Sequence, residues 1–355
     1  MKRYWPVDRL WLYGGILFTL LLLLVGCSSD TSSPDGNGEA SNNQTFKFTF
    51  NSNFPKATTG YEGEYLMIEK FAQRVEEESE GRITFDLHFS NALVGGDQIL
   101  DALASGTIDF ALTVPQYYGD IVPSTFVVNL PFWSESTEHA LKLLKESEVG
   151  EILEQETEAY GAKTLIYGPT GEYGLMSNTP IYSIDDLKGL VFRSGGGLWT
   201  PWYEELGLAS ANVGVSEVYE AMQRGVIDGY PSPYRNIESF KWHEVTDYII
   251  MPPILSSNYM VTYVSLQTWN KLPSDLQQII LDVAAEIEQE TIEGAEYLTQ
   301  ETLNFAQEYG VEIITLPDEE VEKLKASSQI VWDNFAQMSE NNARIVEILN
   351  RELGR

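Results

Sequence analysis

Residues 97–109 read DQILDALASGTID, and residues 216–228 read SEVYEAMQRGVID. Each stretch begins with a residue that often caps a helix, continues with apolar residues at helical spacing, and reaches a glycine that can end the helix. Units of helix, glycine and strand also recur by chance in α/β proteins, so chance is one explanation of the similarity between the two stretches. The other account is two lobes of one design, and two such lobes that face one another would enclose a ligand cleft.

The sequence before the first unit alternates between strand and helix patterns. Apolar residues alternate over residues 46–50 and again over 83–89, while those between residues 65 and 75 recur at helical spacing. Gly81 is placed to end that helix. The order strand, helix, strand, helix, strand predicts an α/β fold with mainly parallel sheets and helices on both faces.

A long helix is predicted in the C-terminal third. Ser274 and Gln277 can form a capping box, apolar residues follow at helical intervals, and neither Gly nor Pro interrupts the segment before Gly294. A helix that continues to Tyr309 would be about 54 Å long at ~1.5 Å per residue. A coiled coil is the alternative, but the polar residues after position 289 break the heptad. We therefore expect one helix that spans both lobes.

The N-terminus has the layout of a secretion signal. Basic residues precede an apolar run over residues 10–25, which is shorter than the roughly 20 residues of a membrane-spanning helix, so a retained anchor is the less favoured alternative. The segment Leu24-Val25-Gly26-Cys27 resembles the bacterial lipobox, in which cleavage precedes the cysteine and the thiol receives a diacylglycerol. Cys27 is the only cysteine, so no internal disulfide can form. We expect residues 1–26 to be a signal peptide and Cys27 to carry lipid that holds the protein at a membrane.

The composition of the remaining chain excludes one class of partner. Residues 27–44 are polar and are expected to form a disordered tether. The formal charge is −31, and removal of the basic signal brings the mature chain near −33. Such a field repels phosphate backbones, which excludes nucleic acid.

The motifs of enzymes and metal centres are absent from the sequence. His88, His139 and His243 lie far apart, and neither a Gly-x-Ser-x-Gly elbow nor a Gly-x-x-x-x-Gly-Lys phosphate loop occurs. The glycine run at residues 195–197 lacks the third spaced glycine of a dinucleotide site. We expect no catalytic residues, no cofactor and no metal ligand set, while assistance of ligand binding by a metal ion stays open.

Five motifs together resemble the substrate-binding proteins of tripartite ATP-independent periplasmic (TRAP) transporters. The resemblance runs from about Phe46 to the C-terminus and rests on the order and spacing of EEESEGRI (76–83), NLPF (129–132), DDLKGLVFR (185–193), SEVY with GVIDG (216–219 and 225–229) and WNKLP (269–273). It implies two α/β lobes joined by crossing strands, a long helix across both, and closure around the ligand. It also implies a permease with small and large membrane subunits, usually driven by a sodium gradient.

The domain plan follows from these patterns and from the resemblance. Lobe I is expected over residues 45–167 and lobe II over 168–254, while residues 255–355 supply a crossing strand, the spanning helix and C-terminal helices shared by both lobes. We expect a monomer outside the cytoplasm, anchored to the cell membrane as a lipoprotein. Whether that membrane belongs to a Gram-positive surface or faces a periplasm stays open.

Arg193 is the main candidate for ligand binding. The clamp of the family is an arginine at the end of the strand after the Asp-Leu-Lys-Gly turn, and its planar fork matches a carboxylate bidentately. Many carboxylate-binding members carry a second arginine where this chain has Tyr173, and an Asn-Pro pair where it has Ser232-Pro233. The resemblance therefore implies a small organic acid, and a monocarboxylate rather than a dianion. Without the resemblance, Arg193 would be taken for a surface ion-pair residue.

The other candidates lie mainly in an aromatic neighbourhood, whose faces can bury apolar carbon and whose hydroxyls can orient a ligand. The full candidate set is Arg193, Tyr173, Trp199, Ser232, Tyr117, Tyr118, Asn53, Trp133 and Asn258. Trp202, Tyr230 and Tyr234 belong to the same neighbourhood, although most such residues form ordinary core. The predicted function is that of an extracytoplasmic TRAP solute-binding protein. A binding protein of an ATP-driven importer or of a ligand sensor is the alternative that the residues alone do not separate.

Overall fold

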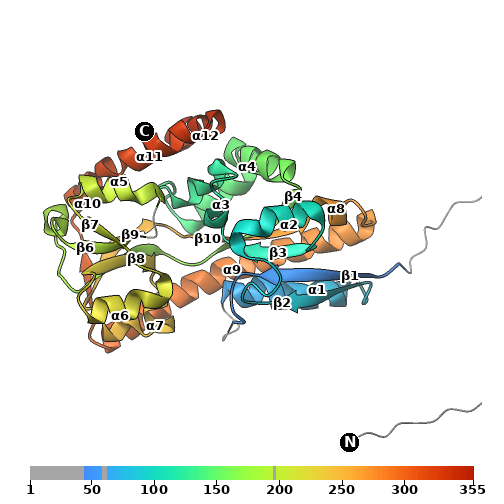
Figure 1. The fold of residues 1–355 in the computed structure, drawn as a ribbon, viewed down its shortest axis with the longest axis horizontal. Coiled ribbons are helices and arrows are strands. Elements are labelled where there is room, and N and C mark those ends of the chain that lie inside the picture. The colour runs from blue at the N-terminus through green and yellow to red at the C-terminus, as the bar shows by residue number, and fades with distance from the viewer. Residues whose placement is uncertain (1–43, 58–61, 195–196) are drawn as a thin grey trace, which may run out of the picture. The chain divides into compact units, whose positions relative to one another are not determined.

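The computed structural model describes residues 44–57, 62–194 and 197–355. The predicted signal peptide, Cys27 and all of the predicted tether except its last residue lie outside the described residues. In the described part, two sheets lie side by side and form the two lobes (Figure 1).

The sheet of lobe I has the strand order β2-β1-β3-β10-β4. Its strands are β1 (Phe46–Ser52), β2 (Ile83–His88), β3 (Phe110–Thr113), β4 (Ala162–Pro169) and β10 (Tyr259–Ser265). β1 pairs in parallel with β2 and β3, whereas β10 pairs antiparallel with β3 and β4. Four of these five strands therefore point the same way, and the reversed one is the strand that enters from lobe II.

The sheet of lobe II has the strand order β11-β9-β5-β8-β6-β7. Its strands are β5 (Tyr173–Ser177), β6 (Val191–Ser194), β7 (Ala209–Asn212), β8 (Gly229–Pro233), β9 (Tyr248–Leu255) and β11 (Glu312–Thr315). Only β5, which enters from lobe I, runs antiparallel to its two neighbours. The predicted two-lobed α/β fold with mainly parallel strands is confirmed, and the reversed strands are the two that cross between lobes.

Helices and short helical turns connect the strands within each lobe. In lobe I they are η1 (Tyr65–Lys70), α1 (Phe71–Glu78), η2 (Gly96–Gln98), α2 (Ile99–Ser105), η3 (Pro115–Tyr117), η4 (Pro123–Asn129), α3 (Thr137–Glu146) and α4 (Glu148–Ala159). In lobe II they are η5 (Ile184–Leu187), η6 (Gly197–Trp199), α5 (Thr200–Glu205), η7 (Val215–Glu217), α6 (Val218–Gln223), α7 (Asn236–Ser239) and η8 (Trp242–Glu244). After β10 come α8 (Leu266–Trp269), α9 (Ser274–Glu308), α10 (Asp318–Ser327), α11 (Gln329–Met338) and α12 (Glu340–Glu352).

The two similar sequence units fold alike, one in each lobe. Each is a 3-10 turn, an α-helix and a glycine with positive φ, 73° at Gly106 and 66° at Gly225, followed by β3 or β8. Their starts differ from the prediction, because Asp97 and Ser216 lie inside the 3-10 turns and do not cap them. In each unit the chain enters the turn from an extended glycine two residues before the predicted cap, Gly95 or Gly214, so the capping residues are glycines.

The aspartate that closes each unit ties its strand to a neighbour. The carboxylate of Asp109 accepts the backbone N–H of Thr49 on β1 at 2.9 Å, and that of Asp228 accepts the N–H of Val191 on β6 at 2.7 Å. These bonds fix the position of β3 beside β1 and of β8 beside β6. The repeated sequence therefore places equivalent strand ends in the two lobes.

Helix α9 spans both lobes, as predicted. It contacts α1 and β4 in lobe I, and α7 and β11 in lobe II (Figure 1). Its buried Glu288 accepts the backbone N–H of Tyr167 on β4 at 2.9 Å and pairs with Lys145, which fastens the helix to lobe I. The predicted capping box is wrong, because Ser274 is the first helical residue and Gln277 donates instead to the carbonyl of Trp269 at 2.8 Å.

The C-terminal helices add a second connection between the lobes. Trp202 on α5 of lobe II donates to Ser327 at the end of α10, and Trp332 on α11 donates to the carbonyl of Pro131 in lobe I. One core cluster accordingly contains side chains from both lobes and from α10, α11 and α12. Within the part of the chain that the structure describes, none of the helices has both the length and the apolar character needed to cross a bilayer.

Candidate functional site

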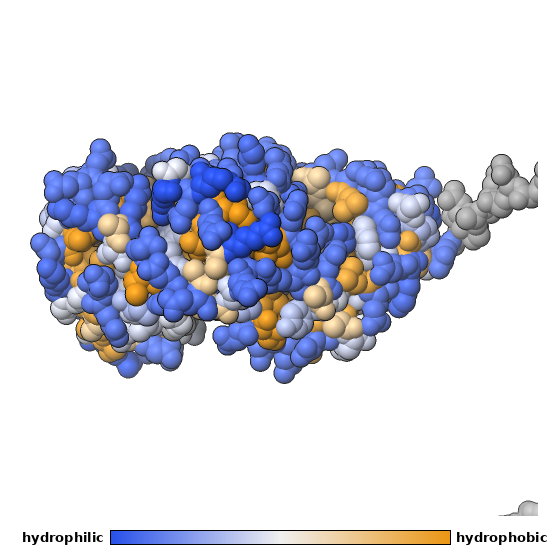
Figure 2. Space-filling model, turned by 90° about the horizontal axis from the view of Figure 1, so that it is seen from above, coloured by the Kyte–Doolittle hydropathy of each residue, from blue (hydrophilic) through white to orange (hydrophobic). Residues whose placement is uncertain are grey.

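The carboxyl-terminal edges of the two sheets face one another across the lobe boundary. Both crossing segments, residues 170–172 and 256–258, are only three residues long, so the end of β4 lies near the start of β5 and the end of β9 near the start of β10. Ligands of open α/β sheets bind beyond such edges. Figure 2 shows the outline of the molecule indented between the two lobes, on a surface that is mostly hydrophilic.

Arg193 lies near the end of β6 on the lobe II edge. Its Nε donates to the carbonyl of Val213 at 2.8 Å, and its own carbonyl accepts the hydroxyl of Tyr203 at 3.2 Å. The positive charge of Arg193 also lies close enough to the phenol of Tyr173 to oppose the rise in pKa that burial causes there. The described residues include ion pairs of Arg224 and Arg235 but none of Arg193. The guanidinium is therefore held through its Nε by a neutral carbonyl, and its charge is not neutralised by a described carboxylate.

Tyr173 and Trp199 lie beside this arginine. Burial raises the pKa of Tyr173 despite the opposing effect of Arg193, so its phenol is neutral at pH 7. The phenol donates to the carbonyl of Pro231 at 3.2 Å. The ring of Trp199 meets that of Tyr173 edge to face at 5.8 Å, and its Nε1 donates to the carbonyl of Asn129 in lobe I at 2.7 Å. Trp199 thus connects the Arg193 surroundings with the other lobe.

Ser232 joins this group through the sheet. It lies opposite Gly174 in the β5 and β8 ladder, next to Tyr173, and its buried hydroxyl accepts the side-chain N–H of Asn236 at 2.8 Å. Arg193, Tyr173, Trp199 and Ser232 are therefore brought together, and all four belong to lobe II.

The lobe I edge presents uncharged oxygens. Asn258 accepts the backbone N–H of Tyr259 through its Oδ1 at 2.8 Å, which identifies that atom as the oxygen. Gln116 must then direct its nitrogen toward this oxygen, at 3.0 Å, and its Oε1 is left buried without a partner among the described residues. The Oδ1 of Asn53 and the Oγ1 of Thr113 are also buried and have no hydrogen-bond partner among the described residues.

Thr113 and Gln116 were missed by the sequence analysis. Thr113 pairs with Val261 in the ladder, and the backbone N–H of Asn53 donates to Leu112, so these side chains lie at one edge. Polar residues directly after a buried apolar strand were the signal that could have indicated them. Buried polar atoms normally have partners, so unpartnered oxygens at a sheet edge are candidates for contact with a ligand or water.

Five of the nine predicted residues lie outside the Arg193 group. Two of them, Asn53 and Asn258, belong to the lobe I edge described above, and the other three are Tyr118, Trp133 and Tyr117. Tyr118 is buried inside lobe I, where its hydroxyl lies 2.6 Å from that of Tyr263. Trp133 is buried against Tyr259, with ring centroids 6.2 Å apart. Tyr117 is 51% exposed and its ring lies over Gly96, where an added Cβ would come within 2.1 Å of it. Trp202, Tyr230 and Tyr234 are buried core residues, with their polar atoms bound to Ser327, Thr246 and Ile250.

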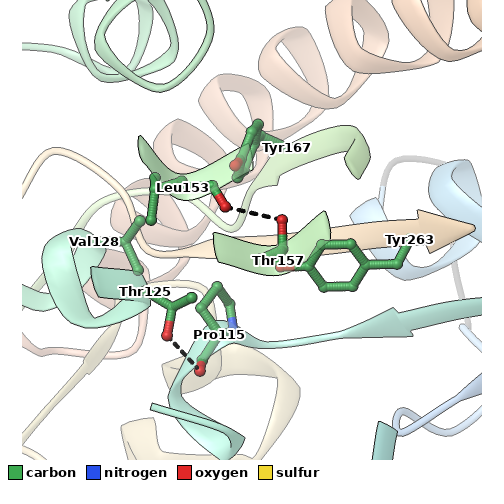
Figure 3. Close-up of a pocket in the computed structure, with 7 residues that line it drawn as sticks. All are labelled: Pro115, Thr125, Val128, Leu153, Thr157, Tyr167 and Tyr263. Carbon is green, nitrogen blue, oxygen red and sulfur yellow. Dashed lines mark hydrogen bonds between the residues drawn. The ribbon is translucent and has the colours of Figure 1, made fainter. Parts of the chain in front are cut away.

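A small cavity inside lobe I is a packing feature. It is lined by Pro115, Thr125, Val128, Leu153, Thr157, Tyr167 and Tyr263 (Figure 3). About 10 Å³ is open to a water-sized sphere, which is about the room that one water molecule needs. The hydroxyls of Thr125 and Thr157 already donate to the carbonyls of Pro115 and Leu153. The cavity is thus too small for an organic ligand. In the described ranges, no group of three or more His, Cys, Asp or Glu side chains is arranged to hold a metal ion.

Comparison with known proteins assigns the family. Residues 56–338 match the model of the bacterial extracellular solute-binding proteins, family 7. The chain belongs to this family. The resemblance to TRAP substrate-binding proteins is thereby confirmed.

Three similar proteins show what the family includes. The sialic acid-binding periplasmic protein of Vibrio cholerae is 27% identical over 77% of this chain and 84% of its own length. The C4-dicarboxylate-binding periplasmic protein of the same organism is 27% identical over 74% of this chain and 79% of its own. A TRAP periplasmic solute-binding protein from Haemophilus influenzae, solved with bound L-gulonate, is 26% identical, with a TM-score of 0.73 over 86% of this chain and 99% of that one.

Proposed function

We propose that this TRAP solute-binding protein captures a small organic acid with one carboxylate between its lobes and delivers it to the small and large membrane subunits of a TRAP permease. The observation that carries the proposal is Arg193. Its guanidinium lies at the ligand-binding edge of lobe II, is held through Nε by the carbonyl of Val213, lies beside Tyr173, and forms no ion pair with the described residues.

Electrostatics favours a local clamp of this kind. The chain carries a formal charge of −31, so it repels an anion at long range. At contact, a desolvated arginine and carboxylate attract each other far more strongly than screened distant charges repel. Because the neighbouring Tyr173 is neutral, this part of the edge offers one positive charge, which suits one carboxylate. Sialic acid and L-gulonate, named for two of the similar proteins, are acids of this class.

The lobe I edge complements this charge with hydrogen-bond acceptors. The unpartnered oxygens of Asn53, Thr113 and Gln116 can accept hydrogen bonds from hydroxyl groups of a ligand. Such an arrangement binds and orients a hydroxylated acid, and supports capture rather than catalysis. We therefore place the carboxylate on lobe II and the remainder of the ligand on lobe I.

The test is calorimetry on the mature chain with Cys27 replaced by Ser, using the best acid from a thermal-shift screen. Arg193→Met should weaken binding by about 2–5 kcal/mol, and Arg193→Lys by less, because Lys keeps the charge but loses the planar fork. Arg224→Met is the matched control, since it removes the same charge from an arginine whose side chain is 70% exposed. Wild-type affinity in folded Arg193→Met, or a best ligand without an acidic group, would contradict the proposal.

Membrane attachment is a separate part of the proposal. Cys27 lies outside the described residues, and its lipidation is supported by the lipobox-like segment before it. Replacement of Cys27 by Ser should release the protein into the soluble fraction. A Cys27→Ser protein that resists alkaline washing would show that the apolar run is itself the anchor.

A further inference from the structure

A second arginine lies at the ligand-binding edge of lobe II. Arg235 follows the end of β8 by two residues, while Arg193 lies near the end of β6. Because β6 and β8 are adjacent and parallel, both arginines lie at the same edge of the sheet. No role for Arg235 was predicted from the sequence.

Glu64 from lobe I occupies the fork of this arginine. Nη1 of Arg235 donates to Oε2 of Glu64 at 3.1 Å, and Nη2 donates to Oε1 at 2.6 Å. The two side chains are 16% and 13% exposed, so the pair is largely removed from water. Glu64 precedes η1 in lobe I and Arg235 follows β8 in lobe II, so the pair bridges the lobes.

The pair with Arg235 lowers the pKa of Glu64. Burial alone would raise the pKa of Glu64, but the charge and hydrogen bonds of Arg235 outweigh it, and the pKa is lowered. Glu64 is therefore ionised at neutral pH. Glu62 adds negative potential at the same guanidinium. The positive charge of Arg235 is thus compensated, unlike that of Arg193.

One donor of Arg235 still lacks a partner. Its Nε is buried and donates to no side chain or backbone atom of the described residues. The next residue, Asn236, donates to Ser232, which lies beside Tyr173 in the Arg193 group. A buried unpartnered donor next to the candidate site points to a ligand atom or a water molecule as its partner.

We propose that Glu64 masks Arg235 and thereby limits the site to ligands with a single carboxylate. This inference rests on the proposed function, in which Arg193 holds that carboxylate. With both Nη groups on Glu64, Arg235 has no free fork for a second carboxylate, and the charge of Glu64 repels one. Glu64 would thus discriminate between ligands by repelling a second carboxylate. It makes no additional contact with a monocarboxylate ligand. Glu64 is a specificity-determining residue.

The experiment compares a monocarboxylate with the dicarboxylate of the same carbon chain. The first pair is L-gulonate and D-glucarate, and the second is the best monocarboxylate of the thermal-shift screen with its dicarboxylate counterpart. Calorimetry on the wild-type protein and on Glu64→Gln gives the ratio of the two dissociation constants in each protein. Using the ratio removes any general effect of the lost bridge on closure. We expect Glu64→Gln to shift the ratio toward the dicarboxylate by about tenfold or more, which corresponds to about 1.4 kcal/mol.

Two controls separate masking from other effects. Glu290→Gln removes the same charge from a carboxylate paired with Lys70 and Arg74, and should leave the ratio unchanged. The double variant Glu64→Gln with Arg235→Met should restore the wild-type ratio, because no guanidinium is left to unmask. The Glu64→Gln variant leaves Arg235 without its ion-pair partner and can therefore be unstable. The double variant removes both partners, so it keeps the test valid in that case.

Each outcome bears on one proposal. An unchanged ratio in folded Glu64→Gln, or an equal shift in Glu290→Gln, would overturn the masking proposal. The proposed function would still stand if Arg193→Met weakened binding as expected. If Arg193→Met bound both acids normally, the proposed function itself would fail.

Discussion

Lobe I and lobe II share a scaffold but differ in the residues that follow their strands. In each lobe a helix ends at a glycine with positive φ, and an aspartate, Asp109 or Asp228, ties the next strand to its neighbour. Beyond β3 the chain presents the uncharged Gln116, whereas the lobe II strands end near Arg193 and Arg235. The repeated sequence thus determines where the strands of the two lobes end. The residues just beyond those ends are not repeated, and they determine which polar and charged groups each lobe presents at its edge.

The largest effect is expected at the contact between Glu64 and Arg235, because this ion pair joins lobe I to lobe II. Loss of one partner of a largely buried pair should cost about 3 kcal/mol of unfolding free energy. Since the pKa of Glu64 is lowered in the folded state, its contribution is full above the ordinary value of 4.5 and is lost as the pH falls through the lowered value.

Urea denaturation of wild type and Glu64→Gln between pH 3 and 7 measures this contribution. The difference between the two proteins should be constant from pH 7 to about pH 5 and should shrink below it. A difference that grows as the pH falls would contradict the charge assignment of the pair.

The two strand-tying aspartates should differ in their effects on stability. Asp109 accepts three hydrogen bonds, from the N–H and hydroxyl of Thr49 and from the hydroxyl of Thr268, whereas Asp228 accepts one, from Val191. Hydrogen bonds to charged groups contribute about 1.5–3 kcal/mol each and are not additive, so Asp228→Ala should cost about 1.5 kcal/mol and Asp109→Ala about 3 kcal/mol. Urea midpoints at pH 7 provide the measurement, and equal losses would show that the two lobes rely equally on this device.

The uncharged edge of lobe I should discriminate hydroxyl groups and ignore charge. Gln116→Leu removes the unpartnered amide oxygen, so a hydroxylated acid should lose about 1 kcal/mol of binding free energy, whereas its deoxy analogue should lose little. Calorimetry with the two acids gives the difference, and Gln267→Leu serves as the control, since Gln267 lies on α8 and donates to Ala104. Equal losses for both acids would remove Gln116 from the site.

The parts of the fold that depend on local sequence were predictable. The absence of Gly and Pro between Pro273 and Gly294 predicted a long helix, and α9 indeed runs through Gly294 to Glu308. The glycines at 106 and 225 predicted where two helices end. The predicted capping box was wrong because the side chain of Gln277 donates a hydrogen bond to the carbonyl of Trp269. The spacing of Ser274 and Gln277 does not reveal this contact.

The candidate site was predictable only in part, for a similar reason. The resemblance indicated Arg193, and Tyr173, Trp199 and Ser232 lie beside it. The contacts of Glu64 with Arg235 and of Gln116 with Asn258 join residues 171 and 142 positions apart. Such pairs form only once the lobes are assembled, so neither their contact nor the unpartnered atoms beside them can be deduced from spacing.

The most direct test of the central claim compares an acid with its primary amide. The best acid of the screen and its amide have nearly the same shape, but only the acid carries the charge that Arg193 is proposed to bind. In the wild-type protein the amide should bind more weakly by about 2 kcal/mol or more, and in Arg193→Met this difference should largely disappear, because the coupling belongs to that pair. If calorimetry finds that Arg193→Met distinguishes acid from amide as strongly as the wild type, the carboxylate is bound elsewhere and the account is wrong.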